Sequence, residues 1–454
     1  MIITAHRKLL ATCYLLLDNI AMHIFFSGIG GTGIGPLALV AKQAGYTVSG
    51  SDKQESLYVD YLREHGITDI SVGQTHESIA ATHARQSIDW YVYSSAVAIE
   101  QPDAPEFQFC RENNIRMSKR DELLNEILTQ KNLKLIAIAG THGKTTTTAM
   151  TIWTMKQLGI PLGYILPAKS NFAEMGAYEE GAQYFVYECD EFDRNFLQFS
   201  PHAAMISGID WDHPDIYPTR EEYYQAFRDF LSQSETSVMW QSDMLRLQRQ
   251  PGEKDVVLSD TDEKMKLIQL AGEVNRRNAW LVANALVVLP DYPPNRLSDY
   301  LEKLEQFPGI SRRFEQITPG LYSDYAHTPE KIRGALQLGH EVADENLVVV
   351  YEGLHNTRQH FIHNELEALF EGAKKLYVVP SYLAREDETL ELLTPEKLIA
   401  GMNEVVQANA EPAALEDHLK QRLQTHLDSG DTVLCLSAGG GGSLDEWLRR
   451  EFQE

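Results

Sequence analysis

The strongest chemical signal in the sequence is the glycine-rich stretch GTHGKT at residues 140–145, between an apolar run and a helical pattern. Backbone N–H groups and a lysine in such a turn hold phosphate oxygens, and a hydroxyl group opening the helix reaches Mg²⁺. The spacing departs from G-x-x-x-x-G-K-[ST], because Ile138 stands five residues before Gly143. We therefore predict a compact triphosphate-binding loop in which Lys144 holds phosphate and Thr145 contacts the metal. A purely structural turn is the alternative.

Carboxylates follow the next apolar run along the chain. Residues 184–188 read as a strand, and the acidic stretch ECDEFD covers residues 188–193. Such clusters are more often solvated turns, but the end of a buried strand beside a phosphate loop is where a Mg²⁺ ligand is needed. A further apolar run at 203–209 leads to Asp210-Trp211-Asp212-His213. Because open α/β sheets bind ligands at the carboxyl ends of their strands, we expect His213 in the same site.

A second glycine-rich turn lies near the start of the chain. Residues 28–33 read GIGGTG, which fits G-x-G-x-x-G between a strand and a helix, and Asp52 follows at the distance of a ribose-binding acid. Bare backbone in such a turn lets a diphosphate approach the helix N-terminus. This pattern predicts a site for a nucleotide diphosphate but does not identify the nucleotide. A tight turn with a purely structural role is the alternative.

The elements that must position these residues alternate between strands and helices. We predict strands at 22–27, 47–50, 135–139, 347–351, 376–379 and 432–436, with helices at 34–44 and up to residue 158 after the phosphate loop. This order is typical of α/β folds with mainly parallel sheets. The predicted domains are an N-terminal extension at 1–21, a first domain at 22–131, a central domain at 132–308 and a C-terminal domain at 309–454.

The composition limits the function classes. The chain has 454 residues, 43% of them hydrophobic and 23% charged, which predicts a globular protein of two or three domains. The net charge of -25 argues against nucleic-acid binding. Four scattered cysteines predict neither a zinc site nor a disulfide framework and fit a reducing compartment. No segment has the roughly 18 apolar residues of a spanning helix.

Taken together, these features predict a cytoplasmic protein. The extension at 1–21 weakly imitates a signal peptide, but Asp18 ends its apolar run. Export is the minority alternative.

The motifs together resemble the Mur ligases of peptidoglycan synthesis, in order from about Met22 to the C-terminus. The resemblance rests on GTHGKTTT at 140–147, ECDEFD at 188–193, the Asp212-His213 pair, the asparagines Asn275 and Asn278, RRFE at 312–315 and DYAH at 324–327. It implies a Rossmann-like N-terminal domain, a P-loop ATPase-type central domain and a Rossmann-like C-terminal domain. Residues 23–33 and the SSA stretch at 94–96 look most like the alanine-adding members of the family.

The resemblance implies an activity and its cofactors, ATP and Mg²⁺. The lactyl carboxylate of UDP-N-acetylmuramate would attack the γ-phosphate of ATP, and the amino group of L-alanine would then displace phosphate from the acyl phosphate. The first domain would hold the UDP-sugar and not a dinucleotide.

Site residues follow from the same resemblance. Catalysis is expected from Lys144, Glu188, His213 and Arg313, and metal binding from Thr145, Glu188 and His213. ATP is expected at Gly140, Thr141, His142, Gly143, Lys144, Thr145, Thr146, Asn275, Asn278, Arg313 and Asp324. The UDP-sugar is expected at Gly28, Gly30, Gly31, Thr32, Gly33, Ser51, Asp52, Ser94 and Ser95, and the incoming amino acid at His327, Thr357 and Arg358.

One stretch departs from the alanine-adding pattern. Residues 354–358 read LHNTR where HRYTR is expected, so Thr357 and Arg358 alone match. This stretch, with Glu352 and the glycine-rich residues 437–442, is similar instead to the recycling ligase that attaches a murein tripeptide to UDP-N-acetylmuramate. That ligase is the main alternative.

Two alternatives come from other classes. A nicotinamide-dependent oxidoreductase would explain residues 28–33 and Asp52 but would leave Lys144, Glu188 and His213 without a role. A non-enzymatic nucleotide-binding regulator would have no need of Arg313 on the γ-phosphate.

Overall fold

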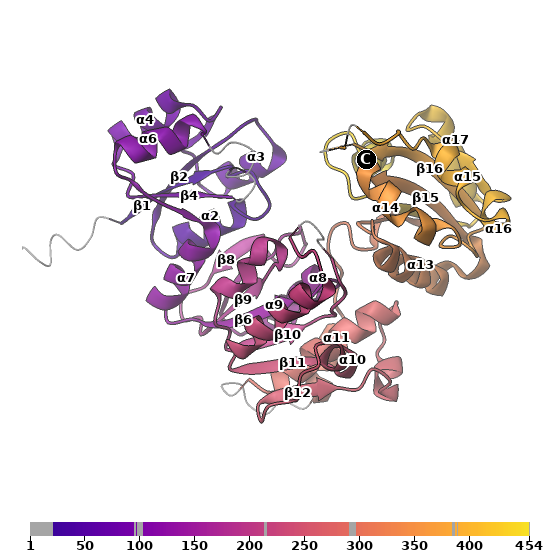
Figure 1. Cartoon of the computed structure of the whole chain (residues 1–454), viewed down its shortest axis with the longest axis horizontal. Helices are drawn as coiled ribbons and strands as arrows, with labels where there is room; N and C mark the ends of the chain where they lie inside the picture. Colours follow the sequence, from indigo (N-terminus) through magenta and orange to yellow (C-terminus); the bar gives the residue numbers. More distant parts are fainter. Residues whose placement is uncertain are drawn as a thin grey trace, which may run out of the picture.

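The chain folds around three separate β-sheets. The computed structural model describes residues 21–94, 97, 103–212, 216–289, 297–383, 386–387 and 389–453. The sheets have five, seven and six strands and follow one another along the chain. The N-terminal and C-terminal domains lie on the same side of the central domain (Figure 1). The predicted three-domain α/β fold is confirmed, whereas the extension at 1–21 lies almost wholly outside the described residues.

The N-terminal sheet is entirely parallel, with the strand order β3-β2-β1-β4-β5. Its central strand β1 is fully buried, as expected of a parallel sheet covered on both faces. The strands are β1 (His23–Ser27), β2 (Thr47–Asp52), β3 (Ile70–Val72), β4 (Trp90–Tyr93) and β5 (Arg116–Lys119). The helices are α2 (Gly35–Gln43), α3 (Leu57–Glu64), α4 (His76–Arg85), α6 (Pro105–Glu112) and α7 (Arg120–Gln130).

The central sheet has the order β12-β11-β10-β6-β9-β7-β8, and β8 alone pairs antiparallel. Its strands are β6 (Lys134–Ala139), β7 (Leu162–Ile165), β8 (Gly176–Tyr178), β9 (Tyr184–Glu188), β10 (Ala203–Ile206), β11 (Thr236–Trp240) and β12 (Asp255–Leu258). The helices are α8 (Lys144–Gln157), α9 (Arg220–Ser232), α10 (Gln241–Arg246), α11 (Glu273–Val287) and α12 (Leu297–Leu304), with the 3₁₀ turns η1 (Phe192–Gln198) and η2 (Glu263–Leu267).

One strand of the central sheet ends earlier than predicted. The apolar run at 203–209 predicts a strand of that length, but β10 ends at Ile206. The next residues turn toward the phosphate loop, where the Thr141 N–H donates to the Gly208 carbonyl at 2.7 Å and the Asp210 N–H donates to the Thr141 hydroxyl at 2.8 Å. These backbone groups therefore brace the loop instead of extending the sheet.

The C-terminal sheet has the order β13-β14-β18-β15-β16-β17, with β13 antiparallel to β14. Its strands are β13 (Glu315–Thr318), β14 (Leu321–Asp324), β15 (Leu347–Leu354), β16 (Lys375–Tyr382), β17 (Ala410–Pro412) and β18 (Thr432–Leu436). The helices are α13 (Pro329–Ala343), α14 (Asn356–Leu366), α15 (Pro395–Ala400), α16 (Glu404–Gln407), α17 (Asp417–Asp428) and α18 (Leu444–Phe452), with the 3₁₀ turn η3 (Asp344–Asn346).

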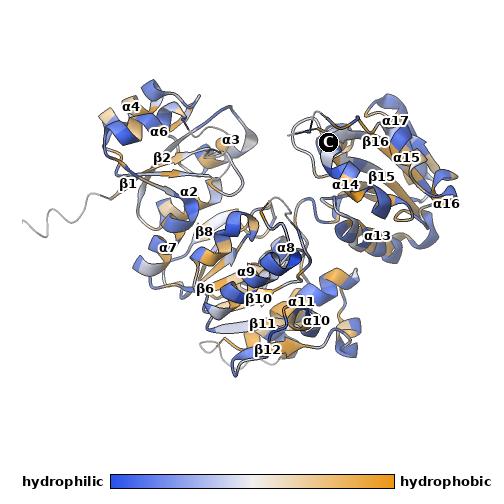
Figure 2. Ribbon diagram, viewed as in Figure 1, coloured by the Kyte–Doolittle hydropathy of each residue, from blue (hydrophilic) through white to orange (hydrophobic). Residues whose placement is uncertain are grey.

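The N-terminal and central domains share one hydrophobic core. Ile24 and Phe26 of β1 belong to the same buried cluster as Leu135, Phe185 and Phe227 of the central domain. The apolar strands lie inside the domains, and polar residues gather on the outer helices (Figure 2). The buried clusters of the C-terminal domain contain residues of that domain alone. The first two domains are therefore packed as a unit, and the third has its own core.

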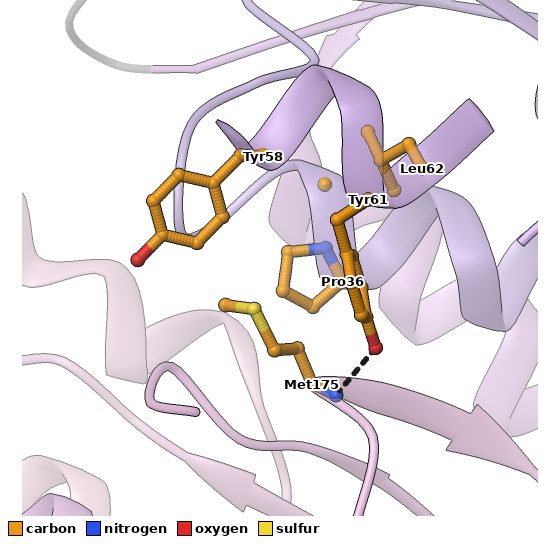
Figure 3. A pocket seen from close by; sticks show the side chains of 6 residues that line it. Pro36, Tyr58, Tyr61, Leu62 and Met175 are labelled. Carbon is orange, nitrogen blue, oxygen red and sulfur yellow. Dashed lines mark hydrogen bonds between the residues drawn. The ribbon is translucent and has the colours of Figure 1, made fainter. Parts of the chain in front are cut away.

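A close contact between α2 and β8 fixes the first two domains against each other. A methyl group on Gly176 would collide with the Pro36 carbonyl, so the backbones touch at this point. Nearby, the Met175 N–H donates to the Tyr61 hydroxyl at 3.3 Å (Figure 3). The Tyr61 hydroxyl also donates to Glu174. The cavity beside these residues measures only about 10 Å³. This volume suits a packing defect and not a ligand site.

The linker to the C-terminal domain has an unusual backbone. Gly309, Arg312 and Phe314 have φ values of 83°, 59° and 49°. A left-handed conformation costs a non-glycine residue roughly 1–2 kcal/mol. Here it is stabilised by the Phe314 N–H donating to Asp324 at 2.8 Å and the Arg312 N–H donating to Glu315 at 2.7 Å. The linker is therefore a fixed turn, and it positions Arg313 toward the central domain.

Two further predictions concern the state of the cysteines and the presence of membrane-spanning helices. Cys110, Cys189 and Cys435 are buried free thiols. Of the helices in the described part of the chain, none is long and apolar enough to cross a membrane.

Candidate functional site

A cavity of about 600 Å³ lies where the three domains meet. Four groups of residues line it: Thr32 of the first glycine turn, residues 141–146 of the phosphate loop with Glu188 and Asp190, Asn275 and Asn278 of α11, and Arg313, Asp324 and Lys331 of the C-terminal domain. The structure thus brings together residues that are up to about 300 positions apart in the sequence.

The phosphate loop has the backbone shape that an anion site requires. Gly140 and Gly143 have φ values of 138° and 74°, and α8 begins at the next residue, Lys144. A methyl group on Gly140 would lie 2.8 Å from the Gly208 carbonyl, and one on Gly143 would lie 2.8 Å from the Asn278 side chain. Glycine is therefore required at both positions. The N–H groups at the start of α8 lie at the end of the helix that borders the cavity.

Lys144 is held by a carboxylate next to the loop. Its Nζ donates to Glu191 Oε2 at 2.6 Å and to the Gly140 carbonyl at 2.7 Å, and Asp190 lies at 4.0 Å. Burial lowers the pKa of Lys144, but Glu191 and Asp190 outweigh this effect and raise the pKa above its usual range. The lysine is therefore a permanent cation. Glu191 is only 1% exposed, and the sequence motif alone did not indicate this pairing.

Glu188 lies at the end of β9 with an unsatisfied oxygen. Its Oε2 is buried and has no hydrogen-bond partner among the described residues. Burial raises the pKa of Glu188, whereas the nearby Lys144 and the Thr145 hydroxyl lower it. A carboxylate oxygen without a partner next to a helix-opening hydroxyl suits a hard cation such as Mg²⁺. No three His, Cys, Asp or Glu side chains cluster as metal ligands within the described ranges. The predicted third ligand, His213, lies outside them.

Arg313 reaches the phosphate loop from the C-terminal domain. Its Nη2 lies 3.5 Å from the Thr145 hydroxyl, and its guanidinium is 5.1 Å above the Tyr325 ring. The arginine therefore faces the point where α8 begins. This contact between residues 168 positions apart connects the C-terminal domain to the central one.

Three further residues expected to bind ATP line the same cavity. Asn278 is buried against Gly143, and the amide of Asn275 donates to the Ala271 carbonyl at 2.9 Å. Asp324 accepts the N–H groups of Phe314 and Ala326, both at 2.8 Å. Asp324 thus shapes its own domain, and each carboxylate oxygen retains a free lone pair for a ligand.

The first glycine turn is braced by residues that were predicted to bind ligand. Asp52 accepts the Gly30 N–H at 2.8 Å, and the Gly28 N–H donates to the Ser51 carbonyl at 2.9 Å. The Ser94 hydroxyl accepts the Val97 N–H at 3.3 Å. Gly31, Thr32 and Gly33 complete the turn before α2. Ser95 lies outside the described residues.

A buried glutamate beneath this turn was missed by the sequence reasoning. Glu106 is fully buried and accepts hydrogen bonds from Ser27 at 2.6 Å, Ser51 at 2.5 Å and Tyr91 at 3.0 Å. Burial raises the pKa of Glu106, and the three hydroxyl donors oppose that shift. A single glutamate in a helix gives no sequence signal, because its partners come from three different strands.

Arg120 is a second residue that was missed. It opens α7 directly after β5, and a methyl group on Gly33 would collide with its Nη1. Glu188 and Asp190 lie within electrostatic reach of the guanidinium. Arg120 therefore stands between the first glycine turn and the acidic cluster. Its place at the carboxyl end of a parallel strand is the signal that could have indicated it.

The predicted amino-acid residues lie on the C-terminal domain. Thr357 accepts the Asp387 N–H at 2.9 Å and donates to Glu386 at 3.2 Å. Burial and nearby cations lower the pKa of His327 to about 3, so the imidazole is neutral at pH 7. Arg358 has neither a hydrogen bond nor an ion pair with any described residue. Because it has no such partner, Arg358 remains available for an anionic ligand. It also lies within electrostatic reach of His327.

Comparison with known proteins places the chain in a family. Residues 23–132 match the model for "Mur ligase family, catalytic domain", residues 138–279 that for "Mur ligase middle domain", and residues 312–439 that for "Mur ligase, glutamate ligase domain". The UDP-N-acetylmuramate–L-alanine ligase of Nocardioides sp. is 30% identical, over 92% of this chain and 93% of that protein. That of Carboxydothermus hydrogenoformans is 29% identical, over 92% of this chain and 94% of that protein.

Solved structures agree with this result. The UDP-N-acetylmuramate-alanine ligase of Thermotoga maritima has a TM-score of 0.72 at 25% identity, covering 95% of this chain and 98% of that one. A murein peptide ligase of Psychrobacter arcticus shares the fold, with a TM-score of 0.58 at 20% identity over 96% and 99% of the two chains.

This chain belongs to the Mur ligase family. It is accordingly an ATP-dependent, ADP-forming ligase, and the comparisons give no support to the oxidoreductase alternative.

Proposed function

We propose that this protein joins L-alanine to the lactyl carboxylate of UDP-N-acetylmuramate while ATP is converted to ADP and phosphate. The observation that carries the proposal is the shared cavity, which is lined by Thr32 of the UDP-sugar turn, Lys144 of the phosphate loop and Arg313 of the C-terminal domain. The names of the relatives support the choice of substrates. The same reaction gives the protein its place in peptidoglycan precursor synthesis.

In the proposed mechanism the protein neutralises and positions anions. A carboxylate oxygen of the sugar forms a bond to the γ-phosphorus, and the bond to the β-bridging oxygen breaks to release ADP. The alanine nitrogen then attacks the acyl carbon, loses a proton and displaces phosphate. Lys144 and Arg313 offset the repulsion between carboxylate and triphosphate, and bound Mg²⁺ would add further charge neutralisation at Glu188 and Thr145.

The UDP-sugar site follows from the first glycine turn. We propose that its bare backbone, from Gly28 to Gly33, receives the diphosphate at the start of α2, and that Glu106 fixes this turn through Ser51. Arg120, packed over Gly33, then faces the path from the sugar to the acidic cluster.

Replacing Gly33 by alanine tests this UDP-sugar site. The added methyl group displaces the flexible end of Arg120 and fills the space above the turn, so the KM for UDP-N-acetylmuramate should rise about tenfold while the KM for ATP stays within twofold. Steady-state ADP release with each substrate varied gives both constants. Arg120→Met is the companion variant, because it removes the guanidinium but leaves the turn open. An unchanged KM for the sugar in both variants would place the sugar elsewhere.

Three further assignments belong to the proposal. We place the domain boundaries at 131/132 and 308/309, with residues 1–21 as an extension. The net charge of -25 favours small-molecule partners over nucleic acid, and UDP-activated substrates favour a cytoplasmic location.

The identity of the amine is the sharpest test of the proposed reaction. We expect L-alanine to be the best substrate, with glycine and L-serine poorer, because Arg358 can pair with the carboxylate that every amino acid carries. Leu354, which is 9% exposed, and His355, with a φ of 57°, replace the usual wall of that pocket. One methylene discriminates by only roughly 1–3 kcal/mol, so selection among small amino acids should be loose.

The measurement is ADP release with UDP-N-acetylmuramate and a panel of free amino acids and murein peptides. Omitting the sugar serves as the control for uncoupled ATP hydrolysis. Stimulation by murein tripeptide and by no free amino acid would favour the recycling ligase, the alternative that Glu352 and residues 437–442 suggest.

A further inference from the structure

The cavity contains a third cation that no sequence motif indicated. Lys331 lies in the first turn of α13 and lines the cavity together with Lys144 and Arg313. It has neither a hydrogen bond nor an ion pair with another residue of the described ranges. Its neighbour on the cavity wall, Glu330, pairs instead with Arg333 at 3.4 Å. Lys331 is thus a half-buried lysine without a partner of its own.

The position of Lys331 is electrostatically unfavourable without a ligand. The first turn of a helix carries a partial positive charge, which favours acidic residues and opposes a lysine. Burial, Lys144 and Arg313 all lower the pKa of Lys331, Asp212 and Glu191 partly oppose them, and the resulting pKa is about 8. A cation held beside two other cations at a helix start is stabilised when an anion enters the cavity.

The arrangement of the three cations indicates which anion that is. Lys144 extends from the phosphate loop, and Arg313 lies 3.5 Å from the hydroxyl that opens the same helix. Lys331 approaches from the C-terminal domain, whose α13 packs against α11 of the central domain. The group that all three can reach must therefore lie in front of the phosphate loop, on the side that faces the C-terminal domain, where the terminal phosphate of a bound nucleotide would lie.

We propose that Lys331 is a further catalytic residue of this ligase, and that its ammonium group binds the γ-phosphate of ATP and the phosphoryl group during its transfer. This inference rests on the ATP-binding part of the proposed function. Lys331 and Arg313 together make the C-terminal domain the source of two of the three positive charges. A nucleotide without a γ-phosphate does not reach Lys331, so the residue distinguishes ATP from ADP.

The test compares ATP with ADP in the full-length protein. Lys331→Met should weaken Mg²⁺-ATP binding about tenfold or more, since a hydrogen bond to a charged group is lost, and leave ADP binding within twofold. Isothermal titration calorimetry gives both affinities. Arg333→Met is the matched control, because it removes a positive charge from the exposed side of the same helix. In that variant both affinities should match the unaltered protein.

Kinetics provide the second readout. We expect kcat for ADP release to fall about 100-fold in Lys331→Met, with the KM for UDP-N-acetylmuramate unchanged and partial recovery in Lys331→Arg. Lys331→Gln replaces the methionine variant if the latter fails to fold. Equal affinities for ATP in the variant and the unaltered protein, or equal losses for ATP and ADP, would overturn the inference. Inactivity of the unaltered protein with alanine would instead overturn the proposed substrates and leave the binding test valid.

Discussion

Lys144→Ala is expected to reduce ligation by about 10³-fold or more, while the affinity for UDP-N-acetylmuramate stays within twofold. In the proposed site the lost ammonium faces the triphosphate, whereas the proposed sugar turn belongs to another domain. ADP release with all substrates present measures the first effect, and calorimetric titration with the UDP-sugar measures the second. Near-normal turnover would exclude the phosphate loop from the mechanism.

The partner of Lys144 complicates this variant and also supplies its control. Glu191 is 1% exposed and lies 2.6 Å from the lysine, so alanine leaves an uncompensated buried carboxylate. Breaking a buried pair in this way costs about 3–5 kcal/mol of folding stability. The double variant Lys144→Ala with Glu191→Gln should regain most of that stability and remain inactive. Recovered activity would show that the single variant had lost its fold and not its chemistry.

Glu188→Gln is expected to reduce kcat about 100-fold or more without destabilising the protein. The reaction loses a proposed Mg²⁺ ligand, and saturating Mg²⁺ should not restore the rate. Glu188 Oε2 is buried without a hydrogen-bond partner among the described residues, and burial raises the pKa of this carboxyl group. Removing that desolvated charge should leave the free energy of unfolding unchanged or slightly increased.

Two measurements on this variant separate function from stability. Chemical denaturation gives the free energy of unfolding, and ADP release at increasing Mg²⁺ gives the metal dependence. Glu235→Gln is the matched control, since this glutamate of the same domain pairs with His202 near the surface. A destabilised Glu188→Gln protein with normal kinetics would assign Glu188 a structural role.

The sequence predicts the strands and the phosphate loop well, because both have local signals. Strand β18 has the predicted bounds, and β9 ends at the acidic cluster as expected. At the end of β10, the strand predicted for residues 203–209 was too long. An apolar run does not show that its last backbone groups hydrogen-bond to Thr141 instead of to a neighbouring strand.

The parts of the site that could not be predicted depend on tertiary contacts. Glu106 is tied to strands that lie far from it in the sequence, and Lys331 reaches the cavity only because α13 packs against α11. Each is a single charged residue in an ordinary helix, where a solvated side chain is the usual expectation. Asp52, a residue expected to bind ligand, also braces its own turn, and this contact too depends on the folded chain.

The pairing of Lys144 with Glu191 means that a nucleotide at the proposed site would have to compete with a carboxylate for the lysine. An incoming anion must displace a carboxylate that already lies at 2.6 Å, with the Tyr223 hydroxyl 3.4 Å away on the other side of that glutamate. A small anion such as inorganic phosphate offers the lysine little more than the carboxylate does. In the proposed site a triphosphate would also engage the helix start and the cations of the C-terminal domain, so it could displace the carboxylate. The internal carboxylate would then exclude weakly bound anions, and the loop would select for the number of contacts and not for charge alone.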